Sequence, residues 1–315
     1  MSCHARSSNG LNLLKTNRFH VLRFLPLAII LGTAAVFLEM LLSGGMTKIT
    51  AWYLLQMVLP VSGVIGLLFS IVRSLVVKRL DRTAVVTGIA SLLALAPALM
   101  MVFPPTYPAS LEHTSPSVTV RLPADVPLKV IWGGDSRAVN QHVIVPDQRW
   151  AYDFLVEPYL TGSSNLADYG CYGVPVLAPA AGLVAIAHDG EPDMVPGQPS
   201  NNIEAPTGNH VVILLDETGT YLEIAHLKQG SLMVSSGQRV EEGQVIGQCG
   251  NSGNTSEPHI HIHHQRQNPA EYPINFAEGL PLYFRDHDGA PMPQGGVKVV
   301  DGTPVAAGDT VTHQP

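Results

Sequence analysis

The chain has 315 residues, of which 46% are hydrophobic and only 14% are charged. Half of its 18 Lys and Arg residues, but only Glu39 and Asp81 among its 25 acidic residues, lie within the first 103 positions. Residues 104–315 therefore carry a large negative excess. This excess excludes a nucleic-acid partner, because neutralising phosphates requires clustered Lys and Arg.

Three stretches near the amino terminus are long and apolar enough to cross a bilayer, which takes about 20 residues. They are Phe24–Leu42, Ala51–Val72 and Thr83–Phe103, and the only charge within them is Glu39. A helical hairpin buried in a soluble core is the alternative, but a small domain seldom buries three such helices. We predict a three-helix transmembrane region over residues 24–103, preceded by an amino-terminal tail of residues 1–23.

The basic residues predict how these helices are oriented. They cluster before the first stretch and in the loop Arg73–Arg82, whereas Lys48 alone lies between the first and second stretches. The positive-inside rule then places the amino terminus and the Arg73–Arg82 loop in the cytoplasm. Three crossings leave everything after Phe103 outside. Pro104–Ser117 follows as an extended linker, because its prolines prevent a helix from continuing.

Residues 118–286 show short apolar or alternating runs separated by Gly, Pro, Asn and Asp, a pattern typical of β structure. We expect a mainly β, antiparallel domain here. Gly190–Gly208 is interpreted as a loop, and residues 287–315, which show no period, as a flexible tail. The expected strands are Ser117–Leu122, Pro127–Trp132, Trp150–Val156, Pro175–His188, His210–Asp216, Thr220–His226, Gln244–Cys249 and His259–Gln267.

The three cysteines are too few for a disulfide framework. Cys3 is expected to be cytoplasmic and reduced. Cys171 and Cys249 lie beside predicted strands of the outer domain, where oxidation is permitted. A disulfide and a pair of buried free thiols are both compatible with this pattern.

The most informative string is GNSGNTSEPHIHIHH, from Gly250 to His264. Alternate residues of a strand share a face, so His259, His261 and His263 project together. Two imidazoles about 6–7 Å apart on one face can serve as a metal ligand and a neighbouring acid or base. Upstream, the run YLEIAHL places His226 at the end of another strand.

These motifs together resemble the lysostaphin-type zinc peptidases, which cut peptidoglycan cross-bridges. Members of that family show "GN.V.I", then "Y.HL", then "V..G..IG..G.TG.S.GPHLH", and residues 208–261 carry similar motifs in the same order. The string YGVPVLAPAAGLV, residues 172–184, resembles the family's "G.PV.A...G.V" hairpin. The resemblance covers about Trp150–Arg266 and implies a bacterial protein whose peptidase domain lies outside the inner membrane.

The resemblance also implies a zinc ion and roles for individual residues. His261 and Asp153 would be zinc ligands, and His226 and His259 would flank the catalytic water. The family's first histidine ligand stands four residues before the aspartate, where this chain has Arg149. Arginine stays protonated and cannot bind zinc. We therefore expect His142, returned to the site by the loop that follows it, to be the third ligand.

His263 stands where the family often has Glu and is expected to support the ligands, whereas His264 should point to the opposite face. Two functions follow from these patterns. The first is a membrane-anchored zinc metalloendopeptidase acting on peptidoglycan cross-links or another extracytoplasmic peptide. The second, which Arg149 keeps open, is a metal-free homologue that binds cell wall or partner proteins and regulates other hydrolases.

The topology can be tested with reporter fusions. An enzyme that is active only outside the cytoplasm should give signal when fused at Ser110 and none when fused at Arg79, because the positive-inside rule assigns these positions to opposite sides. The reverse pattern of signals would refute the assigned orientation.

Overall fold

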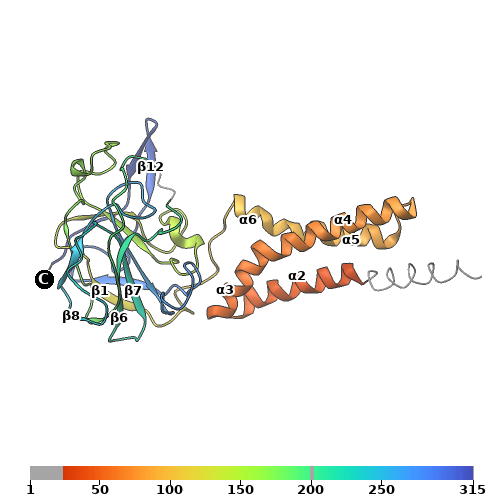
Figure 1. Ribbon diagram of the computed structural model, residues 1–315, viewed down its shortest axis with the longest axis horizontal. Coiled ribbons are helices and arrows are strands. Elements are labelled where there is room, and N and C mark those ends of the chain that lie inside the picture. Colours follow the sequence, from red (N-terminus) through yellow and green to blue (C-terminus); the bar gives the residue numbers. More distant parts are fainter. Residues whose placement is uncertain (1–23, 199–201, 315) are drawn as a thin grey trace, which may run out of the picture. The chain divides into compact units, whose positions relative to one another are not determined.

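The computed structural model describes residues 24–198 and 202–314, which form two compact units, Met1–Pro105 and Thr106–Pro315. Figure 1 shows helices in the first unit and strands in the second. The mainly β, antiparallel fold predicted for the outer domain is confirmed. Residues 1–23, including Cys3 and the predicted cytoplasmic tail, lie outside the described residues.

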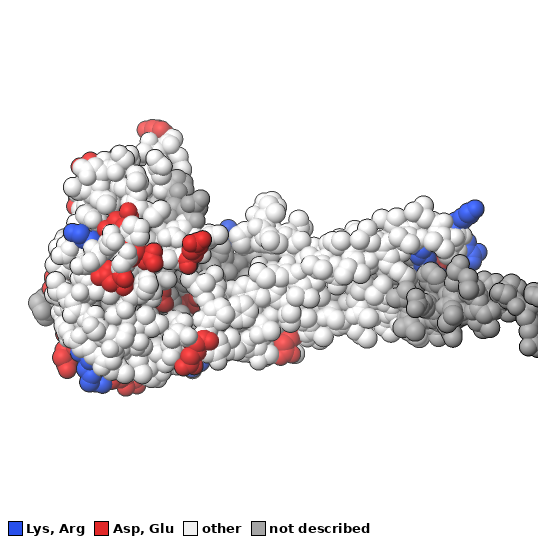
Figure 2. All heavy atoms as spheres, in the orientation of Figure 1, with Lys and Arg blue, Asp and Glu red and all other residues white. Residues whose placement is uncertain are grey.

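The first unit contains three apolar helical segments, each long enough to span a membrane: Leu25–Leu42, Gly45–Val77 and Arg82–Val102. The face of this unit seen in Figure 2 shows few charged side chains except at the end where the helices Leu59–Val77 and Arg82–Leu95 join, where Lys and Arg gather. The elements are α2 (Leu25–Leu42), α3 (Gly45–Tyr53), a π-helix (Leu54–Val58), α4 (Leu59–Val77), α5 (Arg82–Leu95), a 3₁₀ turn (Ala96–Ala98) and α6 (Leu99–Val102).

The second segment is longer than predicted. It begins at Gly45, so that Lys48 lies within a helix and only Ser43 and Gly44 separate it from α2. A π-helical turn interrupts it just before Pro60, whose missing N–H breaks the regular ladder of hydrogen bonds. Small residues bring α4 and α5 close together, since a Cβ built on Gly63 would lie 2.7 Å from the Ser91 carbonyl oxygen.

The second unit is built on an eight-stranded antiparallel sheet in the order β14-β2-β3-β10-β7-β6-β5-β8. Two smaller antiparallel pairs, β4-β9 and β12-β13, and one parallel pair, β1-β11, accompany it. The strands are β1 (Val118–Arg121), β2 (Leu128–Trp132), β3 (Tyr152–Leu155), β4 (Pro175–Leu177), β5 (Gly182–His188), β6 (Asn209–Leu215), β7 (Tyr221–Leu227), β8 (Arg239–Val240), β9 (Val245–Gln248), β10 (Ile260–Gln265), β11 (Leu282–Arg285), β12 (Val297–Val300), β13 (Thr303–Ala306) and β14 (Thr310–Val311).

Strand alternation separates the core of this unit from a polar face. Tyr152 and Phe154 of β3 pack against Phe284 with ring centroids 4.9 and 5.4 Å apart, and all three are buried. Asp153, between them, points to the other face of the sheet. In β10, Ile260 and Ile262 join the same core cluster. The histidines between them therefore share the face of Asp153.

The carboxy-terminal segment corrects the expectation of a flexible tail. Residues 287–314 contain β12, β13 and β14, and β14 extends the main sheet by pairing Val311 with Leu128. Val311 is fully buried in the core cluster. The tail lacks a recognisable period because its strands are only two to four residues long.

The other differences between the predicted and the observed elements are confined to single segments. The predicted strand Pro175–His188 is two strands, β4 and β5, separated by the turn at residues 178–181. The predicted linker is held by the second unit from Thr106 onward, since Tyr107 is buried and its N–H donates to the Val143 carbonyl oxygen. Gly190–Gly208 contains no named strand among its described residues, as expected.

The open question of the cysteines is answered by a disulfide between Cys171 and Cys249, whose Cα atoms are 5.7 Å apart. The two residues are separated by 78 positions in the chain. The bond ties the segment before β4 to the end of β9, directly upstream of the turn that leads into β10.

Removal of this disulfide should destabilise the outer domain. The chain-entropy model assigns a crosslink of this span about 4 kcal/mol of unfolding free energy. The double variant Cys171→Ala/Cys249→Ala should therefore show a clearly lower urea midpoint in the full-length protein, whereas Cys3→Ala should match the wild type. An unchanged midpoint in the double variant would contradict a stabilising role.

Candidate functional site

The centre of the site is a pair of facing residues on neighbouring strands. His261 of β10 lies opposite Asp153 of β3 in the antiparallel register, and both point away from the aromatic core. Asp153 is only 4% exposed, as is His261. The register of these two strands therefore places a carboxylate and an imidazole side by side in a buried environment.

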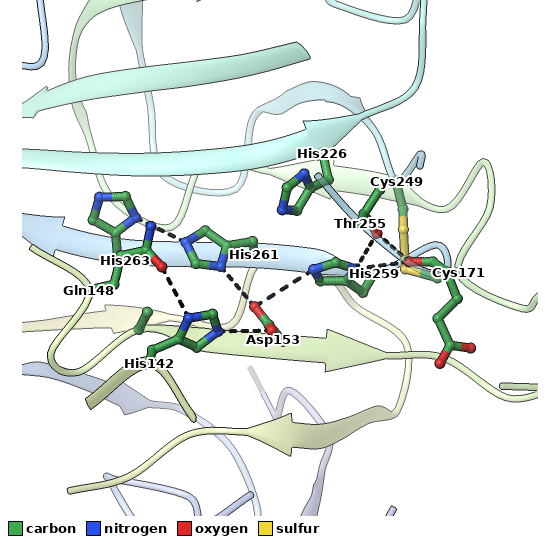
Figure 3. A network of polar contacts seen from close by, with 12 residues as sticks. His142, Gln148, Asp153, Cys171, His226, Cys249, Thr255, His259, His261 and His263 are labelled. Carbon is green, nitrogen blue, oxygen red and sulfur yellow. Dashed lines mark hydrogen bonds and ion pairs between the residues drawn. A yellow bond between two sulfur atoms is a disulfide. The ribbon is translucent and has the colours of Figure 1, made fainter. Parts of the chain in front are cut away.

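The carboxylate of Asp153 contacts two histidines at once (Figure 3). Its Oδ1 is 2.8 Å from His261 Nδ1 and its Oδ2 is 2.9 Å from His142 Nε2. One ligand atom from each of the three residues lies within 4.8 Å of the others. The described residues contain no second group of His, Cys, Asp or Glu that meets this condition.

His142 reaches this cluster from a 3₁₀ turn, Gln141–Ile144, eleven positions before Asp153. The turn is fixed by Asn140, whose side-chain oxygen accepts the His142 backbone N–H at 3.0 Å. The following segment, which contains Pro146, folds back into β3. The structure thus brings His142, Asp153 and His261 together, as the sequence predicted.

The outer nitrogens of both histidines have hydrogen-bond acceptors. His142 Nδ1 lies 3.0 Å from Gln148 Oε1 and can only donate to it. His261 Nε2 lies 3.0 Å from His263 Nδ1, and His263 Nε2 lies 2.9 Å from Gln265 Oε1, so a donor chain runs from His261 to Gln265. In this structure His142 Nε2 and His261 Nδ1 donate to Asp153, but a proton on His142 Nδ1 and one on His261 Nε2 would leave both of these nitrogens free to bind a metal.

His226 and His259 form a second pair beside the cluster, with ring centroids 4.7 Å apart. His226 Nδ1–H donates to the Ser252 carbonyl oxygen at 2.8 Å, and His259 Nδ1–H donates to that of Glu257 at 2.8 Å. Each ring therefore keeps Nε2 as an acceptor. His259 Nε2 lies 3.7 Å from Asp153 Oδ1, which places this pair at the edge of the candidate metal site.

The backbone at His226 is unusual because its φ is +60°, in the left-handed region that non-glycine residues seldom adopt. The conformation is held on both sides, since the His226 N–H donates to Thr207 and its carbonyl oxygen accepts from Gly250. Such a departure at the end of β7 turns the ring towards the groove. Strain of this kind is often found at functional sites.

The protein environment favours the ionised form of one site residue, Asp153, and the neutral form of another, His226. Burial opposes ionisation of Asp153, but His142 and His259, with the hydrogen bonds from His142 and His261, hold the pKa of its carboxyl well below the usual value. Burial, together with His259 and His261, holds the pKa of His226 well below its usual value. At neutral pH, Asp153 is therefore an anion and His226 a neutral acceptor.

The cluster opens into a groove of about 520 Å³. His226, His259, His142 and Asp153 line one part of it, and the loop residues Asn254–Glu257 line another. A groove of this size can receive an extended peptide segment. Its floor is the polar face of the sheet.

Arg149, which occupies the family's first ligand position, lies outside the groove lining. It is buried, forms a 2.8 Å ion pair with Asp135 and donates to the carbonyl oxygens of Tyr107 and Ala109. It also stacks over the Trp150 ring at 4.9 Å. Arg149 therefore fastens residues 107–109, which follow the apolar helices, to the rest of the second unit and takes no part in the cluster.

Glu257 is a groove residue that our sequence reasoning missed. It lines the groove, is 8% exposed and accepts the Leu160 N–H at 2.8 Å. The signal was present, because Glu257 precedes Pro258 where the family pattern has glycine. His264 points to the opposite face as expected and bonds with Thr220 and the Pro281 carbonyl oxygen.

Known proteins support the family expected from the sequence. Residues 165–273 match the model of peptidase family M23. The matched stretch includes His226, His259 and His261 and begins downstream of His142 and Asp153. No curated protein matches the chain.

Several solved structures are similar to part of the chain. A zinc-containing peptidase from Vibrio cholerae is 20% identical over 47% of this chain and 36% of its own, with a TM-score of 0.31. The catalytic domain of lysostaphin from Staphylococcus simulans is 19% identical over 47% of this chain and 84% of its own, with a TM-score of 0.29. A variant of the catalytic domain of the prophage-encoded M23 protein EnpA from Enterococcus faecalis is 15% identical over 51% of this chain and 93% of its own, with a TM-score of 0.34.

The chain thus spans about a third of the length of the Vibrio cholerae peptidase. The match over residues 165–273 includes β7, which carries His226, and β10, which carries His261. This part of the second unit therefore matches peptidase family M23, in agreement with the lysostaphin-type resemblance found in the sequence.

Proposed function

We propose that the outer domain is a zinc metalloendopeptidase that hydrolyses peptide bonds of peptidoglycan cross-links outside the cytoplasmic membrane. The observation that carries this proposal is the buried Asp153 carboxylate with His142 Nε2 and His261 Nδ1 at its two oxygens. Three apolar helical segments ahead of the domain suit a membrane anchor.

The residues of the cluster fit a zinc ion by their chemistry. Two imidazole nitrogens and a carboxylate oxygen are a donor set that catalytic zinc sites use, and the outer acceptors Gln148 and His263 would let each ring carry its proton on the nitrogen away from the ion. His142, Asp153 and His261 would hold the ion. A bound zinc supplies Lewis acidity, which polarises the scissile carbonyl and lowers the pKa of water.

His226 and His259 supply the proton transfers of the proposed reaction. The Nε2 atom of one ring accepts a proton from the attacking water, whose oxygen forms a bond to the carbonyl carbon. As the peptide C–N bond breaks, that proton is delivered to the leaving nitrogen, which departs as an amine. The low pKa of His226 keeps its Nε2 free to accept at neutral pH.

The metal-free regulator is a weaker alternative because the feature that favoured it has another explanation. Arg149 pairs with Asp135 and the segment after the membrane region, so its charge does not enter the cluster. His142 contacts Asp153 at the place where a first histidine ligand is needed. The regulator becomes the better proposal if the purified protein binds no zinc when supplied with it.

The ligand assignment predicts a metal-binding phenotype. The wild-type protein should hold about one zinc per chain, and His142→Ala should weaken zinc affinity at least about a hundredfold, because each ligand contributes a large share of a binding free energy of roughly 10 kcal/mol or more. Zinc content after dialysis against a competing chelator is the measurement. Arg149→Ala is the matched control and should keep its zinc. Full zinc in His142→Ala would show that the third ligand is misassigned.

The proton-transfer roles predict a different phenotype for the other two histidines. His226→Ala and His259→Ala should retain zinc while kcat falls about 10²–10⁴-fold on a cross-linked peptidoglycan peptide, because only general acid–base catalysis is removed. Zinc content and peptide cleavage should be measured on the same preparations. Loss of zinc in His226→Ala would assign this residue to the metal instead.

A further inference from the structure

A side pocket of about 230 Å³ lies against the groove and shares Gln148, Thr207 and Ile274 with its lining. It stands on the same face of the sheet, one step along β10 from the metal cluster. His263, whose Nδ1 accepts from His261, is also in its wall. The side pocket is therefore close enough to the groove to receive a side chain of a peptide bound there.

One end of this side pocket contains two carboxylates. Glu223 of β7 faces His263 of β10 in the register, and Asp147 comes from the turn before β3. Their exposed fractions are only 6% and 3%. Burial raises the pKa of both groups, that of Asp147 to about 6. Each carboxyl thus pays a desolvation cost that a nearby cation would offset.

The pocket lining contains no Lys or Arg, and the side chains in it that can carry a positive charge are the imidazoles of His210 and His263. His210 lowers the pKa of Glu223 and His263 lowers that of Asp147, but burial outweighs both effects. His263 Nε2 is 4.0 Å from Glu223 Oε2, beyond hydrogen-bonding distance, and its proton goes to Gln265. Asp147 Oδ2 accepts the Asn275 N–H at 2.8 Å, but its Oδ1 is buried and has no hydrogen-bond partner in the described part of the chain. The side pocket is therefore acidic, and its carboxyl oxygens are not all matched by hydrogen-bond donors or positive charges.

Much of the remaining wall is apolar, although Gln148, Thr207, His210 and Gln265 also line it, and the pocket is larger than a bare metal ion needs. A water molecule takes about 30 Å³ in the liquid, so the chamber has room for several. The acidic residues and His263 do not gather three ligand atoms within 4.8 Å, in contrast to the cluster around Asp153. The apolar wall consists of Ile186, Pro269, Tyr272, Pro273, Ile274 and Ala277.

We propose that this side pocket binds an aliphatic primary ammonium group of the substrate peptide, with the methylene stem along the apolar wall and the ammonium between Glu223 and Asp147. The peptide part of this inference rests on the proposed peptidase function, whereas the affinity for an alkylammonium group does not. An ammonium group has three donors, which suits an unpaired Asp147 oxygen and the neighbouring Glu223 carboxylate.

The position of the pocket gives this recognition a consequence for cleavage. One imidazole, that of His263, separates its acidic end from the ligand His261. A side chain anchored there would hold the peptide backbone in the groove within a few residues of the bond to be cut. Glu223 and Asp147 would therefore determine which cross-link is cleaved, without touching the reacting atoms.

The binding test uses the full-length protein with zinc, and n-butylamine as the probe. Calorimetry near pH 7.5 should show binding of n-butylamine at least about tenfold tighter than that of 1-butanol, which has the same stem without the charge. Glu223→Gln and, independently, Asp147→Asn should each weaken amine binding about tenfold or more. Asp216→Asn, which removes an exposed carboxylate at the end of β6, should not. Equal binding of amine and alcohol by the wild type overturns the proposal, as does amine binding that both pocket variants leave unchanged.

The substrate test compares peptides that differ only in lysine or norleucine at one position near the scissile bond. The lysine peptide should have a kcat/KM at least about tenfold higher, and Glu223→Gln should abolish that preference while zinc content stays the same. Amine binding without any peptide cleavage would sink the peptidase function and leave the ammonium pocket standing. Peptide cleavage with neither amine binding nor a preference for lysine would refute the ammonium pocket and leave the peptidase function standing. A second equivalent of Zn²⁺ that Glu223→Gln removes would make the pocket a metal site and refute us.

Discussion

The site depends on one interaction, the contact of the buried Asp153 carboxylate with two imidazoles. Each of its oxygens faces a different histidine, at 2.8 and 2.9 Å, so a shift of β3 by one residue would break both contacts. That register is fixed from the other face, where Tyr152 and Phe154 pack into the aromatic core. Core packing on one side of the sheet therefore positions the chemistry on the other side.

Much of this arrangement follows from local sequence patterns. Period-two alternation placed His259, His261 and His263 on one face and His264 on the other, and it placed Asp153 opposite its buried neighbours. What the sequence could not reveal depends on contacts between distant positions. Strand β14 exists because Val311 pairs with Leu128, and the two-residue β8 forms only against β5. Neither strand has enough residues to display a period.

The presence of Arg149 in place of the usual histidine shows that the same cluster of side chains can be built from a different spacing in the sequence. A spacing of four residues is one way to bring an imidazole to the aspartate. This chain uses eleven, because a 3₁₀ turn capped by Asn140 and the segment containing Pro146 return His142 to the same place. The vacated position is then free for a structural role. Arg149 takes it by binding Asp135 and the backbone of Tyr107, in the segment that follows the apolar helices.

His263 connects the cluster of His142, Asp153 and His261 to the acidic side pocket. Many members of the family have a glutamate there, which would accept from His261 and remain an anion. In this chain the imidazole of His263 lies at hydrogen-bonding distance from His261 through Nδ1, and its Nε2–H donates to Gln265 Oε1. A glutamate at 263 would place a third carboxyl group beside Glu223 and Asp147, whose pKa values burial already raises, and each carboxyl would make ionisation of the others less favourable. Histidine at this position therefore contacts His261 without adding a third acidic group to the neighbouring pocket. The residue at 263 thus links the surroundings of the Asp153 cluster to the acidity of the pocket.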